Sequence, residues 1–219
     1  MVRAARPLAV AVGIALAASP ALADPIFAST TAAVGTVDPV WTVAAMHGGY
    51  NDGQARFDEI LASTPFGDAW AWRVEGPVTM LANNASGSNG GVGNYTYFVF
   101  RQTFDLTGYD AATADLEFRW ASDDVPGAVG WTPATSLNGA ALQAGSSGAY
   151  VLGAAVGLNS GFVSGLNTID FYVQGNGQTD GFALSTLSFT AAPVPEPGSL
   201  LLLTFGLGFV AFRLGSRRV

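Results

Sequence analysis

The middle of this 219-residue chain alternates apolar and polar side chains with a period of two. In Asp115–Ala121 every second residue is large and apolar, and charged residues lie between them. Tyr95–Phe104 and Thr168–Gln174 show the same alternation. Because successive side chains of a strand point to opposite faces, these stretches predict antiparallel strands that turn one face to a core and the other to water.

Weaker alternation predicts five more strands: Val40–Ala44, Trp70–Val74, Val78–Leu81, Tyr150–Val156 and Phe182–Thr190. In the last of these the apolar phase slips between Leu184 and Leu187, which predicts a β-bulge. Only Gln54–Ala62 has the spacing of a helix. About eight short strands, separated by turns rich in glycine, asparagine and proline, predict an all-β domain, an antiparallel two-sheet sandwich or jelly roll.

Strand periodicity also assigns the aromatic side chains to faces. It predicts a buried position for four tryptophans: Trp41, Trp70, Trp72 and Trp120. It places Tyr97 and Tyr172 on the outward faces of their strands, where an exposed aromatic ring can stack on a sugar.

The N-terminal segment has the three parts of a secretory signal. Two arginines give it positive charge, and Leu8–Ala18 is an apolar run too short to span a membrane. Ala21 and Ala23 then form the small-x-small pattern of signal peptidase, which makes Asp24 the predicted first residue of the mature protein. Residues 1–23 are therefore a predicted signal peptide for Sec-type export.

Near the C-terminus the chain reads Pro195, Glu196, Pro197. Proline fixes φ and removes a backbone donor, so neither a helix nor a central strand can run through this motif. The motif is therefore predicted to be an exposed, extended linker that a processing enzyme can reach.

An apolar run, Leu200–Phe212, follows and ends in three arginines: Arg213, Arg217 and Arg218. As a helix, residues 198–214 would be about 25 Å long, slightly short of a hydrocarbon core of about 30 Å. A helix that is apolar on every side fits a single membrane span better than the alternative, a buried helix of a soluble domain. Arginines after the span favour a cytoplasmic C-terminus.

This order of a Pro-Glu-Pro motif, a short membrane helix and an arginine cluster resembles the PEP-CTERM sorting signal of Gram-negative bacteria. The resemblance implies that residues 193–219 are a sorting signal and that an exosortase-type enzyme cuts the chain near Pro195–Pro197. It also implies a transient anchor in the inner membrane, after which the protein reaches the cell surface or the extracellular matrix.

Between the two ends, residues 24–192 have the length of one domain. They carry four arginines, no lysine and fifteen carboxylates, a net charge of −11. Such a polyanion argues against nucleic acid as a partner, because it has few cations to place against phosphates. The chain has no cysteine, so an exported domain must rely on its core rather than on disulfides.

Several segments of the second half resemble the galactose-binding-like jelly-roll sandwich: Phe104–Gly108, Ala114–Trp120, Ala121–Asp124, Leu137–Gly139, Gly165–Phe171 and Asp180–Phe182. The resemblance covers roughly Tyr95–Thr190. In that family a short strand usually precedes the Leu-Asn-Gly turn, whereas Val125–Thr135 of this chain has the composition of a loop. The resemblance implies carbohydrate binding by analogy of fold only.

The strongest polar constellation is Asp123-Asp124, which follows a predicted core strand and opens a long loop that contains Trp131. Paired carboxylates can bind Ca²⁺ or accept hydrogen bonds from sugar hydroxyls, and the tryptophan ring can stack on a sugar. The alternative is that the two aspartates only cap a turn. The predicted ligand site is therefore this loop, with calcium as the one candidate cofactor.

Motifs of enzymes are absent from the sequence. His47 is its one histidine, and the patterns of serine hydrolases, P-loop proteins and zinc proteases do not occur. We therefore expect a non-enzymatic protein of the cell surface or exopolysaccharide matrix, with exopolysaccharide as its expected partner. Two alternatives stay open, a lectin-like carbohydrate-binding module and a secreted carbohydrate-active enzyme.

Overall fold

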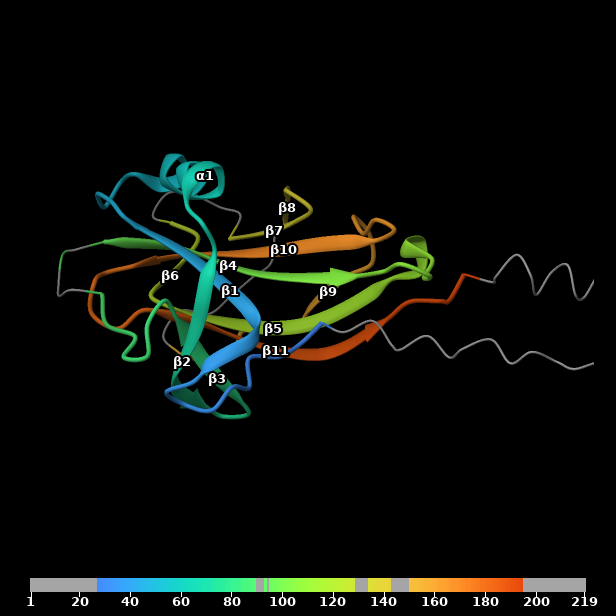
Figure 1. Ribbon diagram of the computed structural model, residues 1–219, viewed down its shortest axis with the longest axis horizontal. Helices are drawn as coiled ribbons and strands as arrows, with labels where there is room; N and C mark the ends of the chain where they lie inside the picture. The colour runs from blue at the N-terminus through green and yellow to red at the C-terminus, as the bar shows by residue number, and fades with distance from the viewer. Residues whose placement is uncertain (1–26, 90–92, 94, 129–133, 143–149, 195–219) are drawn as a thin grey trace, which may run out of the picture.

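The computed structural model describes residues 27–89, 93, 95–128, 134–142 and 150–194 (Figure 1). Within these residues the strands are β1 (Val37–His47), β2 (Gly67–Glu75), β3 (Val78–Ala82), β4 (Thr96–Asp105), β5 (Asp115–Asp123), β6 (Val125–Pro126), β7 (Thr135–Leu137), β8 (Ala140–Leu142), β9 (Val156–Leu158), β10 (Leu166–Gly175) and β11 (Gly181–Thr190). The helices are α1 (Gly53–Ser63) and the short 3-10 helix η1 (Ala111–Thr113). The predicted signal peptide, Pro-Glu-Pro motif, membrane helix and arginine cluster lie outside the described residues.

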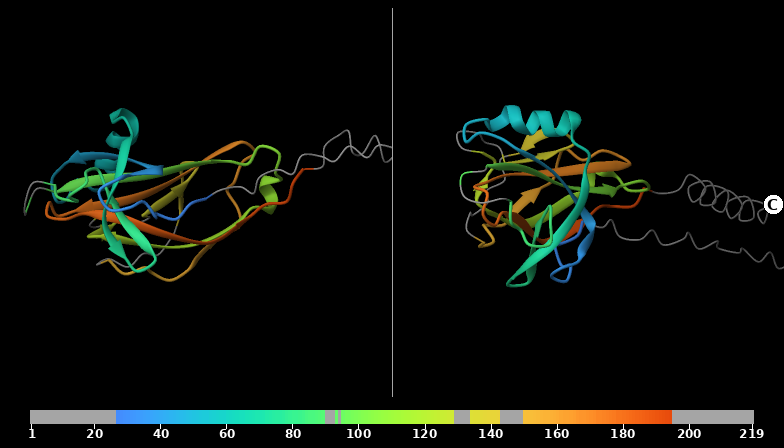
Figure 2. Two further views of the ribbon diagram at one scale, coloured as in Figure 1. Left: turned by 60° about the horizontal axis from the view of Figure 1, so that its bottom comes forward. Right: turned by 60° about the vertical axis from the view of Figure 1, so that its left-hand side comes forward.

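The strands form one continuous antiparallel sheet that is strongly curled. Its order is β8-β7-β10-β4-β1-β2-β3-β11-β5-β9, and β6 pairs with β10. The curl brings β4 and β10 opposite β5 and β11, so that one half of the sheet faces the other (Figure 2). The all-β antiparallel class is confirmed. The predicted two-sheet sandwich or jelly roll is wrong, because β1, β2 and β3 join the two halves by hydrogen bonds.

Irregular pairing of β1, β2 and β3 accounts for the curl. The register of β1 against β2 shifts between Val37 and Thr42, and that of β2 against β3 shifts between Ala71 and Arg73. Bulges bend a strand and increase its twist, so the sheet turns across these strands from one half to the other. Alternation along each strand is the same in a sandwich and in a curled sheet, and the sequence pattern therefore did not distinguish them.

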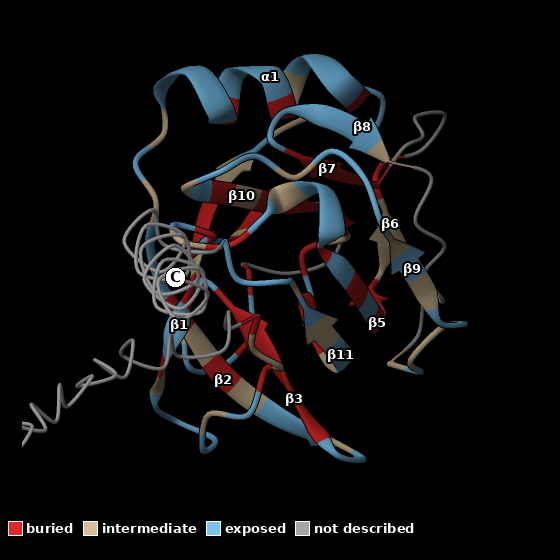
Figure 3. Cartoon of the chain, turned by 90° about the vertical axis from the view of Figure 1, so that its right-hand side faces the viewer, coloured by how far each residue is buried: buried red, intermediate tan, exposed pale blue. Residues whose placement is uncertain are grey.

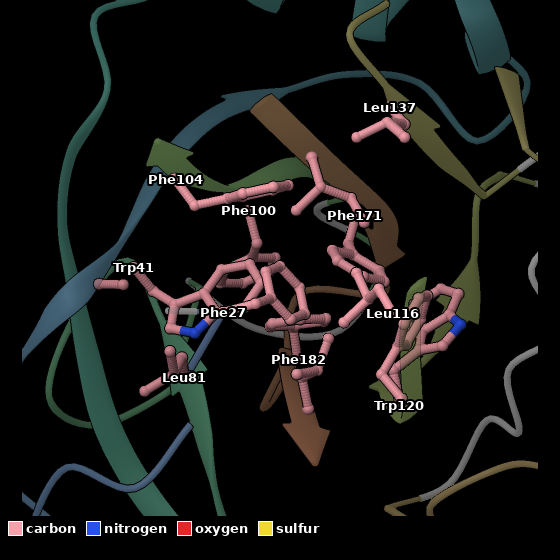
Figure 4. Close-up of a cluster of buried hydrophobic side chains, with 14 of the residues drawn as sticks. Phe27, Trp41, Leu81, Phe100, Phe104, Leu116, Trp120, Leu137, Phe171 and Phe182 are labelled. Carbon is pink, nitrogen blue, oxygen red and sulfur yellow. The ribbon is translucent and has the colours of Figure 1, made fainter. Parts of the chain in front are cut away.

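The core fills the space between the two halves (Figure 4). Phe171 of β10 and Phe182 of β11 meet there with ring centroids 4.7 Å apart. Trp41 lies 4.9 Å from Phe182, and Trp120 lies 5.1 Å from Phe171. All four side chains are buried, which confirms the positions predicted for Trp41 and Trp120. Edge and tilted ring contacts at these distances add to the gain from burial.

Helix α1 covers the outer face of β4 and β10 (Figure 3). The predicted helix Gln54–Ala62 is confirmed, and Phe57 and Ile60 are its buried side chains. Tyr97 and Tyr172 lie beneath it, with ring centroids 5.2 and 5.1 Å from that of Phe57. Both tyrosines are buried, so the prediction that they are exposed is wrong. Alternation gave their face correctly, but it carries no information about a helix that packs over that face.

The predicted burial of Trp70 and Trp72 is also wrong. The side chains of Ala69 and Ala71 face the core, and the two tryptophans are half-buried on the other side of β2. The core side of β2 therefore carries two small side chains. Trp72 packs instead against the ring of Tyr150, with centroids 6.3 Å apart.

Most predicted strands are confirmed, each within a strand of the sheet or one residue from it. The exception is Tyr150–Val156, of which only Val156 belongs to a strand, β9. The predicted bulge in β11 is confirmed, because the register against β5 shifts between Thr186 and Ser188. Val125–Thr135, which was expected to be a loop, instead begins with β6, paired with β10, and ends in β7, which pairs with β8 and β10.

The last described residues are tied to one end of the sheet. The carbonyl of Ala192 accepts a hydrogen bond from the Asp110 amide at 2.8 Å, and the Val194 amide donates to the Gly108 carbonyl at 2.8 Å. Figure 1 shows this end on the right, beyond the ten-residue strand β11, which spans about 33 Å. Among the described residues, no helix has the length and apolar character that crossing a membrane requires.

Candidate functional site

A groove of about 570 Å³ lies between α1 and the hairpin of β7 and β8. Gln54 and Asp58 of α1 line one side, and both side chains are exposed. Ala141 of β8 lines the other side and is exposed too. Figure 3 shows α1 and β8 next to each other above the outer face of β10. The groove is thus open to solvent between a helix and a sheet edge.

The register of β4, β10, β7 and β8 places a row of cross-strand neighbours on the floor of the groove. Asp170 of β10 is paired with Arg101 of β4 on one side and with Ser136 of β7 on the other. Ser136 is in turn paired with Ala141 of β8. Directly opposite residues point to the same face of a sheet. Four strands therefore present one line of side chains to the groove, from a cation through a carboxylate and a hydroxyl to a methyl group.

The charged pair in this row is fixed in place. Arg101 donates from Nε to Asp170 Oδ1 at 2.7 Å and from a terminal nitrogen to Oδ2 at 2.9 Å. Its guanidinium also lies 4.0 Å from the ring centroid of Phe66, a cation–π contact. The hydrogen bond with Asp170 raises the pKa of Arg101 above its usual value. This bidentate pair neutralises the centre of the floor and holds it rigid.

Beside the pair, a hydroxyl network continues the floor. The hydroxyls of Ser136 and Tyr172 lie 2.9 Å apart and share a buried hydrogen bond. Burial raises the pKa of Tyr172, so the phenol stays neutral and keeps its proton. Because its ring packs on Phe57, the same tyrosine anchors α1 over the sheet.

The turn of the β7–β8 hairpin supports the far side of the groove. Asn138 has a φ of 52° and Gly139 a φ of 79°, the left-handed conformations that two-residue hairpins need. Asn138 Nδ2 donates to the Asn167 side chain at 2.9 Å, and its Oδ1 accepts from the Thr168 amide at 2.9 Å. These bonds tie the turn to β10 and set the width of the groove.

A second polar cluster lies at the tip of the sheet, where β5 ends and β11 begins (Figure 1). Asp123, Asp124 and Asp180 meet there. The amide of Asn176 donates to Asp124 Oδ2 and to Asp180 Oδ1, both at 3.0 Å. Asn89 Nδ2 donates to Asp180 Oδ2 at 3.1 Å. One backbone donor thus joins two carboxylates that would otherwise repel each other.

Burial controls the charge of this carboxylate cluster. Asp123 is only 4% exposed, and its Oδ2 has no hydrogen-bond partner among the described residues. Burial, with the hydrogen bond and charge of Asp124, raises the pKa of Asp123 from 3.8 to about 7. Burial and the charge of Asp124 raise the pKa of Asp180 to about 6, against the hydrogen bond from Asn89. Near neutral pH the cluster therefore retains protons that exposed aspartates have lost.

Predicted site residues are only partly brought together. Asp123 and Asp124 lie in the carboxylate cluster with Asp180. Asp180 was not predicted as a site residue, and it entered only as part of the segment Asp180–Phe182 that resembles a galactose-binding-like fold. Trp131 lies outside the described residues. No three His, Cys, Asp or Glu side chains of the described ranges are placed so that they could hold a metal ion, so the calcium prediction rests on the sequence alone.

Arg101 and Asp170, which form the floor of the groove, were missed as site residues. Both stand at outward positions of alternating strands, which is the usual place for solvated charges. An arginine and an aspartate on strands that are 69 residues apart give no sign of pairing until the register of β4 and β10 is known.

The described part of the chain is thus a curled antiparallel β domain with a polar groove on its outer face. The chain that carries it ends in a PEP-CTERM protein-sorting motif, since the family model of that description matches residues 193–218. The motif implies an exported protein that an exosortase sorts to the cell surface. This match confirms the resemblance of the tail. No curated protein and no solved structure matches the chain, so the galactose-binding-like resemblance gains no support.

Proposed function

We propose that this protein is a non-enzymatic component of the cell surface or exopolysaccharide matrix. The observation that carries the proposal is the sorting motif, which starts at Pro193, within the segment tied to the folded domain. Signal peptidase releases Asp24 as the new N-terminus, and the apolar run holds the chain in the inner membrane. An exosortase-type enzyme then cuts near Pro195–Pro197 and passes the domain on to the surface.

The position of the tail supports a display role. Its first residues pair with the turn at Gly108 and Tyr109, at the end of the sheet remote from the carboxylate cluster. A domain held by that end presents its opposite tip outward. The groove beside α1 lies on the outer face of the sheet and is left uncovered by such an attachment.

Two features favour a binding protein over the alternative of a carbohydrate-active enzyme. The carboxyls with raised pKa, Asp123 and Asp180, are buried in the tip and do not line the groove. In the groove, Arg101 engages both oxygens of Asp170, whereas a glycosidase needs one carboxyl that gives up a proton and a second that attacks or activates water. Reducing-sugar release from purified matrix polysaccharide is therefore expected to stay at background.

The sorting step is tested by replacing the motif in the full chain with Pro195→Ala, Glu196→Ala and Pro197→Ala. The wild-type protein at the surface is expected to begin at Asp24 and to lack Leu200–Val219, because the motif directs cleavage. The triple variant is expected to keep the apolar run and to collect in the inner-membrane fraction. Intact-mass spectrometry of the two fractions measures both outcomes.

The matched control is Pro77→Ala, at an exposed turn proline outside the motif. It is expected to be cut and sorted like the wild type. A surface form of the wild type that still carries the apolar run would contradict the processing step. A triple variant that is cut normally would contradict the role of the motif.

A further inference from the structure

We propose that the groove between α1 and the β7–β8 hairpin binds a segment of uncharged, polyhydroxylated polymer, a neutral polysaccharide chain. The inference rests on the proposed function, because it names the class of matrix polymer that such a surface protein would hold. The volume of the groove, about 570 Å³, lies within the range of about 300–1,000 Å³ that is usual for ligand pockets.

The hydrogen-bonding groups of the groove suit hydroxyls. Each sugar hydroxyl both donates and accepts, so its site must offer both functions close together. Asp58 supplies acceptors, Gln54 supplies an amide that does both, and Thr168 adds a hydroxyl. Arg101 has five N–H groups, of which Asp170 accepts two, and its side chain is 29% exposed. The groove thus offers both donors and acceptors to a hydroxyl.

The charges of the groove disfavour an acidic polymer. Among the described residues that line it, one guanidinium, that of Arg101, is present and already paired with Asp170, and Asp58 adds an exposed negative charge. The whole domain repels polyanions as well, since it carries eleven more carboxylates than arginines. A polyuronate or a sulfated polymer would therefore meet repulsion both at the groove and on approach, whereas a neutral polymer would not.

The groove is also formed before a ligand arrives. The Arg101–Asp170 pair and the Ser136–Tyr172 hydrogen bond hold the floor. Phe57 and Ile60 fix α1 to the sheet, and Asn138 fixes the hairpin. A preorganised site loses little conformational freedom on binding, which matters most for weak contacts repeated along a polymer.

The test expresses the full-length gene, purifies the exported protein from the producing cells, and uses the matrix polysaccharide of the same cells. Anion exchange separates that polysaccharide into neutral and acidic fractions, and affinity electrophoresis measures the binding of each. The wild type is expected to bind the neutral fraction. Ala141→Trp places a bulky ring at the end of the row of side chains and is expected to weaken this binding by at least about tenfold.

The matched control is Ala140→Trp, the preceding residue of β8, which is exposed and does not line the groove. It is expected to bind as the wild type does. Gln54→Ala with Asp58→Ala forms a second variant that leaves the hairpin untouched, and Glu59→Ala is its control on the same helix. If the tryptophan in β8 prevents folding, the double variant of α1 and its control still test whether the groove binds the neutral fraction.

Three results would overturn the inference: binding of the acidic fraction only, binding of neither fraction, or neutral-fraction binding that survives both groove variants. Each of these leaves the proposed function standing if the same proteins are still processed and reach the surface. Failure to reach the surface would contradict the proposed function instead, whatever the purified proteins bind.

Discussion

Phe182→Ala is expected to lower the free energy of unfolding by about 3–5 kcal/mol, the loss that follows removal of a fully buried phenylalanine ring. Phe182 joins the two halves of the curled sheet. Its ring lies within 4.7 to 6.1 Å of four aromatic rings, those of Trp41, Phe100, Trp120 and Phe171. Neighbours that are themselves held by strands on both sides cannot collapse into the space.

A second reason to expect a large loss of stability is that Phe182 lies at the weak pairing between β3 and β11. The pairing of β3 with β11 consists of one residue pair, Leu81 with Phe182. Thr30 reinforces it from the N-terminal segment, donating its amide to the Leu184 carbonyl at 2.9 Å and accepting from the Thr79 amide at 2.8 Å. Removing the ring at this pair exposes the point where the continuous sheet has the fewest paired residues.

Urea unfolding of the exported protein, followed by tryptophan fluorescence, measures the change. Leu187→Ala in the same strand is the control, because Leu187 is 46% exposed and its loss is expected to change stability by no more than about 0.5 kcal/mol. A loss below about 1 kcal/mol for Phe182→Ala would mean that the two halves of the sheet do not pack on each other at this ring.

The local parts of the fold could be predicted from the sequence. Phe118 and Trp120 alternate with charged residues in β5, and the alternation gave both the strand and its buried face. The helix α1 was equally visible, since Phe57 and Ile60 have helical spacing. Each of these signals comes from neighbours along the chain, and the physics that makes them is the same in many folds.

Long-range arrangement was beyond such signals. That β1 pairs with β4 on one edge and β2 on the other decides between a curled sheet and a sandwich, and neither pairing leaves a mark on the alternation of β1. The burial of Tyr97 follows from a helix that packs over it. The groove depends on four strands coming into register at Asp170, so its residues were not predicted as a site.

The carboxylate cluster at the tip of the sheet could be predicted only in part. Asp123 and Asp124 were selected because adjacent carboxylates can bind a cation or sugar hydroxyls, and the structure places them in a cluster of acids. The third member, Asp180, lies directly before β11, and the hydrogen bond that it accepts from the Asn176 amide depends on the turn between β10 and β11. Sequence reasoning thus found two of the three acids, whereas the third acid and the groups that contact it required the fold.

The carboxylate cluster gives the stability of the protein an unusual pH dependence. The pKa of Asp123 in the folded protein is about 7 and that of Asp180 about 6, whereas both are near 3.8 in an unfolded chain. Between about pH 4 and pH 7 the folded state therefore holds more protons than the unfolded state. Stability falls with rising pH wherever the unfolded state binds fewer protons than the folded state. The free energy of unfolding is therefore expected to decrease as the pH rises through this window.

Below this window the sign reverses. Asp52 and Asp105 have lowered pKa values in the folded protein, Asp52 through the hydrogen bond from Arg56 and Asp105 through that from Thr107. Their contribution to stability is present above the unfolded pKa and is lost as the pH falls through the lowered values. Stability is therefore expected to be greatest near pH 4–5, on the acid side of the range usual for proteins.

Asp123→Asn is expected to remove most of the decrease. The amide keeps an oxygen that can accept the hydrogen bond from Tyr150, and its NH₂ group can donate to the neighbouring Asp124 carboxylate. At pH 8 the variant is expected to be more stable than the wild type by about 2–4 kcal/mol, since each pKa unit corresponds to about 1.4 kcal/mol. At pH 5 the wild-type carboxyl is protonated and the two proteins are expected to be nearly equal.

Thermal unfolding at pH 5 and pH 8, with a chelator present so that no cation replaces the proton, measures the difference. A gain of this size corresponds to a rise in Tm of roughly 4–16 °C for a domain of this length. Asp115→Asn at the other end of β5 is the control, because Asp115 is exposed and its replacement removes the same charge far from the cluster. If the wild type instead gains stability from pH 5 to pH 8, the carboxylates of the tip are ionised in the folded protein, and paired donors or a cation rather than protons hold them together.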